Sequence, residues 1–368
     1  MISRRQLLSV IGALMGVIWM DCDLQIANAR SRQRAVFRMP EESARHTRTF
    51  MQWPVNRVVH PDAAFLEDLQ QAIADIANTV AQFEPVVMLM HRDFAANARR
   101  KLAENVDIWD IPTDDLWCRD SGPVFVTDDD GHLAVTHLNF NGWGGKQVHG
   151  NDGKVARRVA QRLELPIHDN ELVGEAGGVE FDGRGTLIAH ESSWVNDNRN
   201  RGSREAVGKL LLEAFGGEKV VWATGVKGVD ITDYHIDSLA RFIEPGTVLI
   251  QLPDTVAAND PWSVAAMQTY RVLEAARDAE GNRFELVVIP DPHEIRVQSD
   301  DFVASYVNYY LCNGAVIAAQ FGDQATDERA RSVLGELYPD REIVTLDVDP
   351  IGEVGGGIHC ATQQQPVV

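Results

Sequence analysis

The chain has 368 residues, of which 45% are hydrophobic and 24% charged, so it contains ample apolar material for a core. This composition excludes a disordered or fibrous protein. Lysine and arginine number 34 and aspartate and glutamate number 54, which gives a net charge of −20. That balance argues against a partner that is mainly nucleic acid, because a negative protein repels phosphates, and it is compatible with a small cationic substrate.

The first 29 residues are predicted to be a signal peptide of the twin-arginine type. The pair Arg4-Arg5 precedes an apolar stretch over residues 7–20, which is short for a membrane span. Ala27-Asn28-Ala29 then supplies the small residues that a signal peptidase requires. We expect removal of residues 1–29 and a periplasmic or secreted protein without a stable membrane span, with an uncleaved anchor as the alternative.

Residues 30–368 are expected to form a single domain built from a repeated unit. Apolar residues three to four positions apart predict five helices, over residues 63–83, 154–165, 204–215, 264–279 and 327–337. Ser203, Ser263 and Thr326 are the expected N-caps of the last three helices, and Gly216 is expected to end the third. Each helix is followed by a short apolar strand candidate, at residues 86–90, 165–167, 220–222, 286–289 and 343–346.

Several units also begin with two strands around a turn of Asp, Asn, Pro or Gly, at residues 124–138, 179–189, 240–251 and 307–318. The unit is therefore strand–turn–strand–helix–strand, recurring about every 50 to 70 residues, a period that predicts a radial or stacked α/β architecture. Five units around an axis place the starts of their strands at one central pocket. Residues 355–362 are expected to close the circle near the strand at 49–53, and a doubly wound sheet is the competing architecture.

Three cysteines follow the signal peptide, Cys118, Cys312 and Cys360, which are too few for a disulfide framework. Either one pair forms or all three are free. Cys360, His235, His359 and Asp237 are zinc-type ligands, but none of them has the spacing of a recognisable metal motif. We therefore predict no metal site.

Five segments carry candidate functional residues, and the first three each present a carboxylate. In residues 117–123 an arginine lies beside Asp120 before Gly-Pro, with a structural ion pair as the alternative. In residues 177–183 two glycines precede Glu180, which suggests close backbone approach, with an exposed glutamate on a hairpin as the alternative. His235 and Asp237, two apart in an expected strand, share a face that suits proton transfer and cation binding.

The other two segments are rich in glycine. Residues 141–146 carry Trp143 but lack the strand–helix context of a phosphate loop, so we predict no nucleotide site. Residues 355–362 place three glycines before Cys360. A buried inert cysteine is the alternative, but the glycines favour a nucleophile that a substrate approaches closely.

Together the five segments resemble the agmatine deiminase family, which includes the peptidylarginine deiminases of the Porphyromonas type. The resemblance covers residues 39–366, and its hallmarks are the stretches at 117–123, 139–145, 177–180, 235–242 and 357–364. It implies the guanidino-group-modifying enzyme fold, a five-bladed, pseudo-fivefold β/α propeller, and hence a single deiminase catalytic domain over residues 30–368.

The resemblance also implies hydrolytic deimination, with agmatine converted to N-carbamoylputrescine and ammonia. A guanidinium stays protonated at neutral pH, so its carbon resists attack unless carboxylates hold the charge and an acid protonates the departing nitrogen. By resemblance, Asp120 and Asp237 hold the guanidinium, and Cys360 attacks its carbon to give a covalent thiouronium intermediate. Neither a metal nor an organic cofactor is implied.

Further roles are carried over in the same way. His235 is implied to protonate ammonia and then to activate water, with Glu180 supporting His235 and the substrate. Trp117 and Trp143 are implied to line the aliphatic arm of the substrate. A homo-oligomer is the expected assembly.

Two departures from the family pattern leave the substrate tail open. Tyr234 precedes the implied catalytic histidine, where the family usually has glycine, and Ser43-Ala44-Arg45 replaces an aromatic-Glu-Pro stretch. An export signal is also unusual for an enzyme of cytoplasmic polyamine metabolism. The alternative functions are a secreted peptidylarginine deiminase making citrulline, an amidinotransferase and a guanidine-binding protein without catalysis.

Overall fold

The computed structural model describes residues 37–299 and 302–368, so the predicted signal peptide at residues 1–29 lies outside the described residues. No helix of this described part is both long enough and apolar enough to span a membrane. Residues Phe37–Val368 belong to one structural unit.

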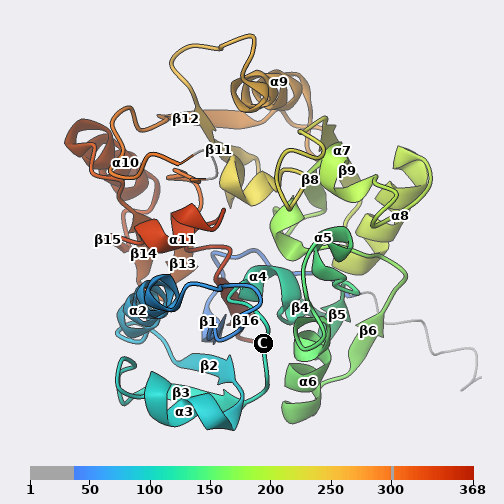
Figure 1. Cartoon of the computed structure of the whole chain (residues 1–368). Coiled ribbons are helices and arrows are strands. Elements are labelled where there is room, and N and C mark those ends of the chain that lie inside the picture. The colour runs from blue at the N-terminus through green and yellow to red at the C-terminus, as the bar shows by residue number, and fades with distance from the viewer. Residues whose placement is uncertain (1–36, 300–301) are drawn as a thin grey trace, which may run out of the picture. The chain divides into compact units, whose positions relative to one another are not determined.

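The strands form five separate sheets (Figure 1), so the single doubly wound sheet considered as an alternative is wrong. The strands are β1 (His46–Gln52), β2 (Val86–Met90), β3 (Val106–Asp110), β4 (Val124–Thr127), β5 (Leu133–His137), β6 (Ile167–Asp169), β7 (Val179–Phe181), β8 (Thr186–His190), β9 (Lys219–Ala223), β10 (Ala240–Glu244), β11 (Thr247–Leu252), β12 (Glu285–Pro290), β13 (Tyr310–Cys312), β14 (Ala315–Ala319), β15 (Glu342–Leu346) and β16 (Thr362–Pro366). Four sheets have the orders β4-β5-β6, β7-β8-β9, β10-β11-β12 and β13-β14-β15, and the fifth has the order β16-β1-β2-β3.

Helices connect and flank these strands. They are α2 (Ala63–Val80), α3 (Arg92–Ala98), α4 (Cys118–Ser121), α5 (Gly142–Gly145), α6 (Val155–Arg162), α7 (Glu191–Trp194), α8 (Arg204–Phe215), α9 (Pro261–Ala275), α10 (Gln324–Leu337) and α11 (Asp349–Glu353), with 3-10 turns η1 (Asp152–Lys154), η2 (Ala176–Gly178) and η3 (Ile236–Ser238). In each three-stranded sheet the first two strands are antiparallel, a helix follows, and the third strand runs parallel to the second. This is the repeated unit predicted from the sequence.

The sheet that contains β1 joins the two ends of the described chain. β1 pairs in antiparallel fashion with β16, with Met51 opposite Thr362, and in parallel fashion with β2. The predicted pairing of the C-terminal segment with the first strand is therefore confirmed, although the pairing residues are 362–366 rather than 355–362, and it holds Cys360 immediately before a strand that is anchored in a sheet. The sequence analysis missed β3, which extends this sheet, and α3, which connects β2 to it.

The capping residues predicted from the sequence are correct for one helix and wrong for two. Ser203 caps α8 by accepting from Ala206 N, and Gly216 ends that helix at φ 69°, as predicted. Ser263 and Thr326, however, are not the caps of α9 and α10: Asp260 and Asp323 are, one turn earlier. Their carboxylates accept from the first free backbone N–H groups.

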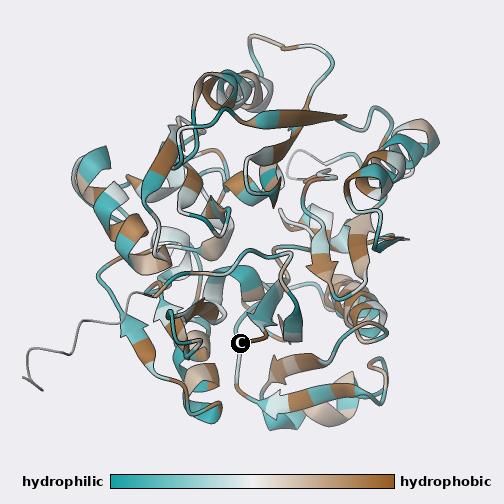
Figure 2. Ribbon diagram, turned by 180° about the vertical axis from the view of Figure 1, so that it is seen from behind, coloured by the Kyte–Doolittle hydropathy of each residue, from teal (hydrophilic) through white to brown (hydrophobic). Residues whose placement is uncertain are grey.

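The core lies along the strands. β2, β5, β8 and β14 are buried at every position, because each runs between two neighbouring strands and is covered on both faces. In Figure 2 the strands are accordingly rich in hydrophobic residues, whereas the helices mix hydrophobic and hydrophilic ones. Short elements between the sheets lie close together: α4 contacts η2 and β16, and η2 contacts η3. These short elements carry most of the candidate functional residues.

Candidate active site

A cavity of about 830 Å³ collects almost all of the residues singled out from the sequence. Its lining includes six of the seven candidates, namely Trp117, Asp120, Trp143, His235, Asp237 and Cys360. Glu180 is not among the lining residues. The candidate side chains from the five segments therefore come together in one cavity, except for that of Glu180.

The backbone of Gly177 lies against the centre of the site. A Cβ on Gly177 would lie 2.8 Å from Nδ1 of His235, 2.9 Å from Oδ1 of Asp120 and 3.2 Å from Oδ2 of Asp237. Three functional groups thus meet at one point, and only a glycine leaves them room. This is the close backbone approach that the glycine pair predicted.

His235 and Asp237 do not lie in a strand, contrary to the expectation. His235 precedes η3, and Asp237 lies within that 3-10 turn. The two side chains nevertheless both reach the cavity, because the turn projects into it between β9 and β10.

The imidazole of His235 lies between two carboxylates. Its Nε2 is 3.3 Å from Oε2 of Glu175, and its Nδ1 is 3.7 Å from Oδ1 of Asp120. Burial alone lowers the pKa of His235, but Asp120 and Glu175 outweigh it, with Asp237, and raise the pKa to about 9. The imidazole is therefore protonated at neutral pH.

Glu175 is a site residue that the sequence analysis missed. It stands two residues before the glycine pair of the second segment, so the glycines were the available signal. Arg199 binds it with Nε at 2.9 Å, and Arg199 also reaches Asp233 at 2.8 Å. Burial raises the pKa of Glu175, but Arg199 and His235 lower it more, so the carboxylate is ionised. Lys146 binds Asp233 at 2.8 Å and completes this network.

Glu180 does not support His235, so that expectation is corrected. It lies on β7, whose neighbour β10 brings Nε of Arg241 to 3.1 Å from Oε1 and the N–H of Phe242 to 3.1 Å from Oε2. Strand geometry turns its side chain toward β10 rather than toward η3. Glu180 is therefore a buried ion-pair partner of Arg241.

Asp237 keeps one oxygen free. Its Oδ2 contacts Nδ1 of His359 at 2.8 Å, while its buried Oδ1 has no hydrogen-bond partner among the described residues. Nε2 of His359 lies 2.8 Å from Oε2 of Glu42, which also binds Arg241 at 2.7 Å. Burial raises the pKa of Asp237, but His359 reverses this effect and lowers it, so the free oxygen is an anionic acceptor.

Asp120 is held by the glycine-rich segments. Nε1 of Trp143 donates to its Oδ2 at 2.9 Å, and the N–H of Gly177 to its Oδ1 at 3.4 Å. Burial raises the pKa of Asp120 to about 6, with Glu175 and Asp237 adding to the rise and His235 opposing it. The guanidinium of the neighbouring Arg119 makes no ion pair with Asp120: its Nη1 donates to Oε1 of Gln364 at 3.0 Å, and its Nη2 lies 3.6 Å from Oε2 of Glu42.

Cys360 carries its thiol into the same cavity. Nδ2 of Asn308 lies 3.2 Å from its Sγ, and Oδ2 of Asp237 lies 3.5 Å away. Burial, with Asp237 and Asp120, raises the pKa of Cys360 well above its ordinary value, so the thiol is neutral in the free protein. Cys118 and Cys312 are buried and free, so they do not form a pair.

The glycines before Cys360 have a steric reason. A Cβ at Gly356 would lie 2.3 Å from the ring of Trp117, and one at Gly357 2.5 Å from Oδ1 of Asn308. Any larger residue would displace the indole or the amide beside the thiol. The run therefore allows the Cys360 segment to lie tightly against the cavity wall.

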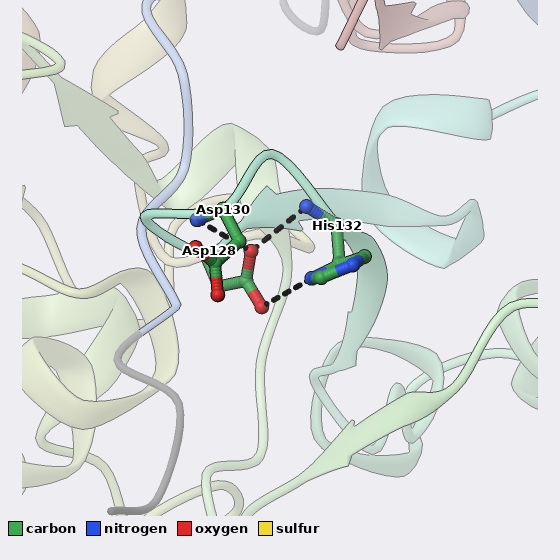
Figure 3. Close-up of side chains that lie close together, drawn as sticks. All are labelled: Asp128, Asp130 and His132. Carbon is green, nitrogen blue, oxygen red and sulfur yellow. Dashed lines mark hydrogen bonds and ion pairs between the residues drawn. The ribbon is translucent and has the colours of Figure 1, made fainter.

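One cluster outside the cavity has metal-type ligands. The turn between β4 and β5 brings Asp128, Asp130 and His132 together (Figure 3). Oδ1 of Asp128 already accepts from the N–H groups of Asp130 and His132, and its Oδ2 lies 3.0 Å from His132 Nδ1. The carboxylate thus stabilises the turn, and the cluster lies apart from the zinc-type ligands considered from the sequence.

Comparisons with known proteins agree with this arrangement. Residues 38–366 match the model of the Porphyromonas-type peptidyl-arginine deiminases. A protein of Streptomyces coelicolor named "Putative agmatine deiminase" is 37% identical over 90% of this chain and 99% of its own length. One of the same name from Selenomonas ruminantium is 33% identical over 90% and 96%.

Solved structures show the same α/β fold. The agmatine deiminase of Enterococcus faecalis is 28% identical and superposes with a TM-score of 0.82 over 90% of this chain and 96% of its own. A structure from Porphyromonas gingivalis named "Putative Arginine Deiminase" is 26% identical, with a TM-score of 0.78 over 90% and 98%.

Proposed function

The chain belongs to the Porphyromonas-type peptidyl-arginine deiminase family, and we propose that it is a C–N hydrolase that converts agmatine and water to N-carbamoylputrescine and ammonia. The observation that supports this proposal best is the negative charge of the side chains that line the cavity. Seven carboxylates line it, those of Asp115, Asp120, Asp230, Asp237, Asp260, Asp291 and Glu353. Lysine and arginine do not occur among its described lining residues. Agmatine is cationic at both ends, whereas free arginine carries a carboxylate that this lining repels.

In the proposed complex the guanidinium lies between Asp120 and Asp237. Two carboxylates match its planar fork of N–H donors, and the free Oδ1 of Asp237 accepts one of them. Trp117 and Trp143 line the methylene chain. Asp120 and Asp237 also keep the bound cation next to Sγ of Cys360, where its charge favours the thiolate.

The reaction then proceeds through a covalent intermediate. The thiol of Cys360 loses its proton to solvent when the cation binds, and the thiolate adds to the guanidinium carbon. The imidazolium of His235 gives its proton to the departing nitrogen, so the C–N bond breaks and ammonia leaves. The remaining thiouronium is attacked by water, whose proton passes to the now neutral His235. Cleavage of the C–S bond releases the urea product, and the second proton of the water returns the sulfur of Cys360 to its thiol form.

The five sheets are proposed to be the blades of a pseudo-fivefold propeller. Contacts between successive sheets support this: β16 touches β4, α8 touches β5, β7 touches β10, α10 touches β12, and α2 of the first sheet touches β14 of the last. The short elements that carry the site then face the axis. An experimental structure in which one repeated rotation relates the sheets tests the proposal.

Export is proposed from the sequence of the first 29 residues alone. The twin arginines and the small residues at 27–29 support cleavage after Ala29. Mass spectrometry of the protein expressed in its own host is expected to find Arg30 at the N-terminus. A mature chain that begins at Met1 refutes the proposal.

The function is tested by ammonia release from agmatine, free arginine and an arginine-containing peptide. Agmatine is expected to react with the highest kcat/KM. Faster release from the peptide establishes the citrulline-forming alternative, amine-dependent transfer of the amidino group establishes an amidinotransferase, and binding without release establishes a binding protein. Cys360→Ala is expected to lower kcat by about 10³-fold or more, since the nucleophile is lost. Unchanged turnover refutes the covalent mechanism.

A further inference from the structure

The cavity has a second acidic wall that the reaction does not use. It is formed by the start of α9 and the end of β12, with Asp260, Trp262 and Asp291 in its lining. Tyr234, which departs from the family pattern, lines the same wall. A volume of about 830 Å³ is in the range for drug-sized ligands, so the guanidinium alone leaves most of it open.

The two carboxylates of this wall are not neutralised by the protein. Oδ1 of Asp291 accepts from Nε2 of Gln251 at 2.7 Å, and the oxygens of Asp260 accept from the N–H groups of Trp262 and Ser263 at 3.0 and 3.1 Å. Neither acid forms an ion pair with a described residue. Burial, with Asp260 and Asp254, raises the pKa of Asp291, which shows an acid crowded by like charges.

Tyr234 provides an independent indication of a ligand. Its side chain is 8% exposed, yet its hydroxyl makes no hydrogen bond to any described residue. The hydroxyl is not among the buried atoms that lack a partner, so it opens into the cavity, where a ligand can reach it. Burial and the charges of Asp291, Asp230 and Asp260 raise its pKa, so this hydroxyl lies in the field of the acidic wall.

The position of Tyr234 is also imposed by the fold. Its φ of 72° is rare for a bulky residue, and such strain often marks a functional position. Nδ1 of His190 lies 2.9 Å from its carbonyl oxygen, while its ring stacks on His190 at 4.6 Å and meets Trp262 edge-on at 4.8 Å. The ring is therefore clamped against the wall, immediately before His235.

The second wall connects to the guanidinium site through direct contacts. Gln251, which holds Asp291, also binds Ala304 O at 2.8 Å. The next residue, Ser305, donates to Ser238 O at 2.7 Å, and Ser238 follows Asp237. Because both walls line the same cavity, one substrate can face both.

We propose that Asp260, Asp291, Tyr234 and Trp262 form a second cation subsite, which binds the ammonium group on the tail of the guanidine substrate. The inference rests on the proposed function and adds the residues that select the protonated amine at the end of the substrate tail. The ammonium donates to the carboxylates and to the tyrosine oxygen, and the aromatic rings attract its charge. A tail that ends in a carboxylate or a methyl group lacks these contacts.

The test compares agmatine with pentylguanidine, in which a methyl group replaces the ammonium. Asp291→Asn keeps the shape and the bond from Gln251, because the amide oxygen accepts as the carboxylate does. Asp260→Asn keeps the shape and one of its two bonds to the start of α9, and asparagine is as good an N-cap as aspartate. Each is expected to lower kcat/KM for agmatine about tenfold and to change pentylguanidine less than about twofold. Tyr234→Phe keeps the stacked ring and is expected to have a smaller effect in the same direction.

Asp62→Asn is the matched control. Asp62 is likewise an N-cap, that of α2, and does not line the cavity. It is expected to leave both substrates unaffected. Equal losses for agmatine and pentylguanidine in the Asp260 and Asp291 variants, or no loss for agmatine, overturn the subsite.

Binding to Cys360→Ala, measured by calorimetry, separates the two proposals. If this variant prefers agmatine over pentylguanidine and loses the preference on adding Asp291→Asn, the subsite stands even if the wild type turns over neither compound. If the wild type hydrolyses agmatine but the preference survives in the double variant, the subsite is wrong and the proposed function stands. Binding of neither compound contradicts both.

Discussion

Behind His235 the fold places a carboxylate, whereas behind Asp237 it places a second imidazole. On the first side Glu175 contacts His235 and is held by Arg199. On the second side His359 contacts Asp237 and is held by Glu42. The carboxylate of Glu175 stabilises the imidazolium of His235, which donates a proton. The imidazole of His359 stabilises the carboxylate of Asp237, which binds the guanidinium cation. Each network thus maintains the charge that its own step requires.

The two networks also differ in their contact with solvent. The first ends at Lys146, whose side chain is 31% exposed. The second encloses Arg241, at 1% exposure, between Glu42 and Glu180. Arg199 is as buried as Arg241, but Glu175 also faces His235 and Asp233 also faces Lys146. Glu180, in contrast, has Arg241 as its one ion-pair partner among the described residues. A buried carboxylate with a second cationic partner tolerates the loss of the first one better. The first side is therefore expected to govern catalysis and the second to govern stability as well as binding.

The largest effect is expected from removing the enclosed arginine. Arg241→Met leaves Glu180 buried without its cation and Glu42 with only His359 and Arg119, and it is expected to lower the free energy of unfolding by about 3–5 kcal/mol. Arg199→Met costs less, about 1–3 kcal/mol, because His235 and Lys146 still face Glu175 and Asp233. Urea denaturation compares the two. An equal or larger loss for Arg199→Met contradicts the contrast between the networks.

Variants of Glu175 and Glu180, five residues apart, test which of the two glutamates supports His235 in catalysis. Glu175→Gln removes the carboxylate beside His235 and is expected to lower kcat about 10²-fold, since proton donation depends on the imidazolium. Glu180→Gln is expected to keep kcat within about threefold and to reduce stability instead. Steady-state kinetics with agmatine measure both. A larger kcat loss for Glu180→Gln restores the assignment made from the sequence.

A variant of Glu42 tests whether this residue positions Asp237 for substrate binding through His359. Glu42→Gln weakens the hold on His359 and is expected to raise KM about tenfold, with a smaller change in kcat, because Asp237 is less firmly positioned. Glu42→Asp should recover part of the loss. Glu41→Gln, one residue earlier, is the control and is expected to change KM less than about twofold. Similar KM values for Glu42→Gln and the wild type refute a positioning role.

The smallest expected effect is a pH dependence. The pKa of His235, raised to about 9, places the loss of proton donation near pH 9, and that of Asp120, raised to about 6, places the acidic limb of kcat/KM near pH 6. In Glu175→Gln the alkaline limb should move to lower pH. A limb that stays near 9 in that variant shows that another group titrates.

Stability follows from the same pKa of His235. Because the folded-state value lies above the ordinary value of about 6.5, the charged imidazole contributes stability that is complete below pH 6.5. This contribution is lost as the pH rises through about 9. Unfolding free energies measured across this window should fall less in His235→Gln than in the wild type, and equal slopes contradict this reading.

Local patterns in the sequence predicted much of the fold. The helix at 204–215 was predicted with both of its ends, because its serine cap and its terminal glycine act within one turn. The hairpins and the strand after each helix were found for the same reason. Where two capping candidates lay close together, as with Asp260 and Ser263, a local rule did not decide between them, because several polar side chains can reach the same N–H groups.

In the candidate site, sequence motifs identified most of the residues but not the contacts between them. Short motifs in three segments indicated Asp120, Asp237 and Cys360, and all three line one cavity. The partner of His235 was assigned to Glu180 rather than Glu175. Both acids flank the same glycine pair, and which one faces the imidazole depends on the packing of β7 against β10.

The sequence by itself determined the repeated strand–turn–strand–helix–strand unit and the residue types of the reaction, because hydrophobic spacing, turn residues and short motifs are properties of neighbouring positions. The tertiary structure alone decided which charges meet: Glu175 with His235, Glu42 with His359, and Asp260 with Asp291 in one cavity. These groups lie far apart along the chain, and their pairing is set by how the sheets contact one another. Electrostatic support of the site is therefore a product of packing between units, which no local pattern encodes.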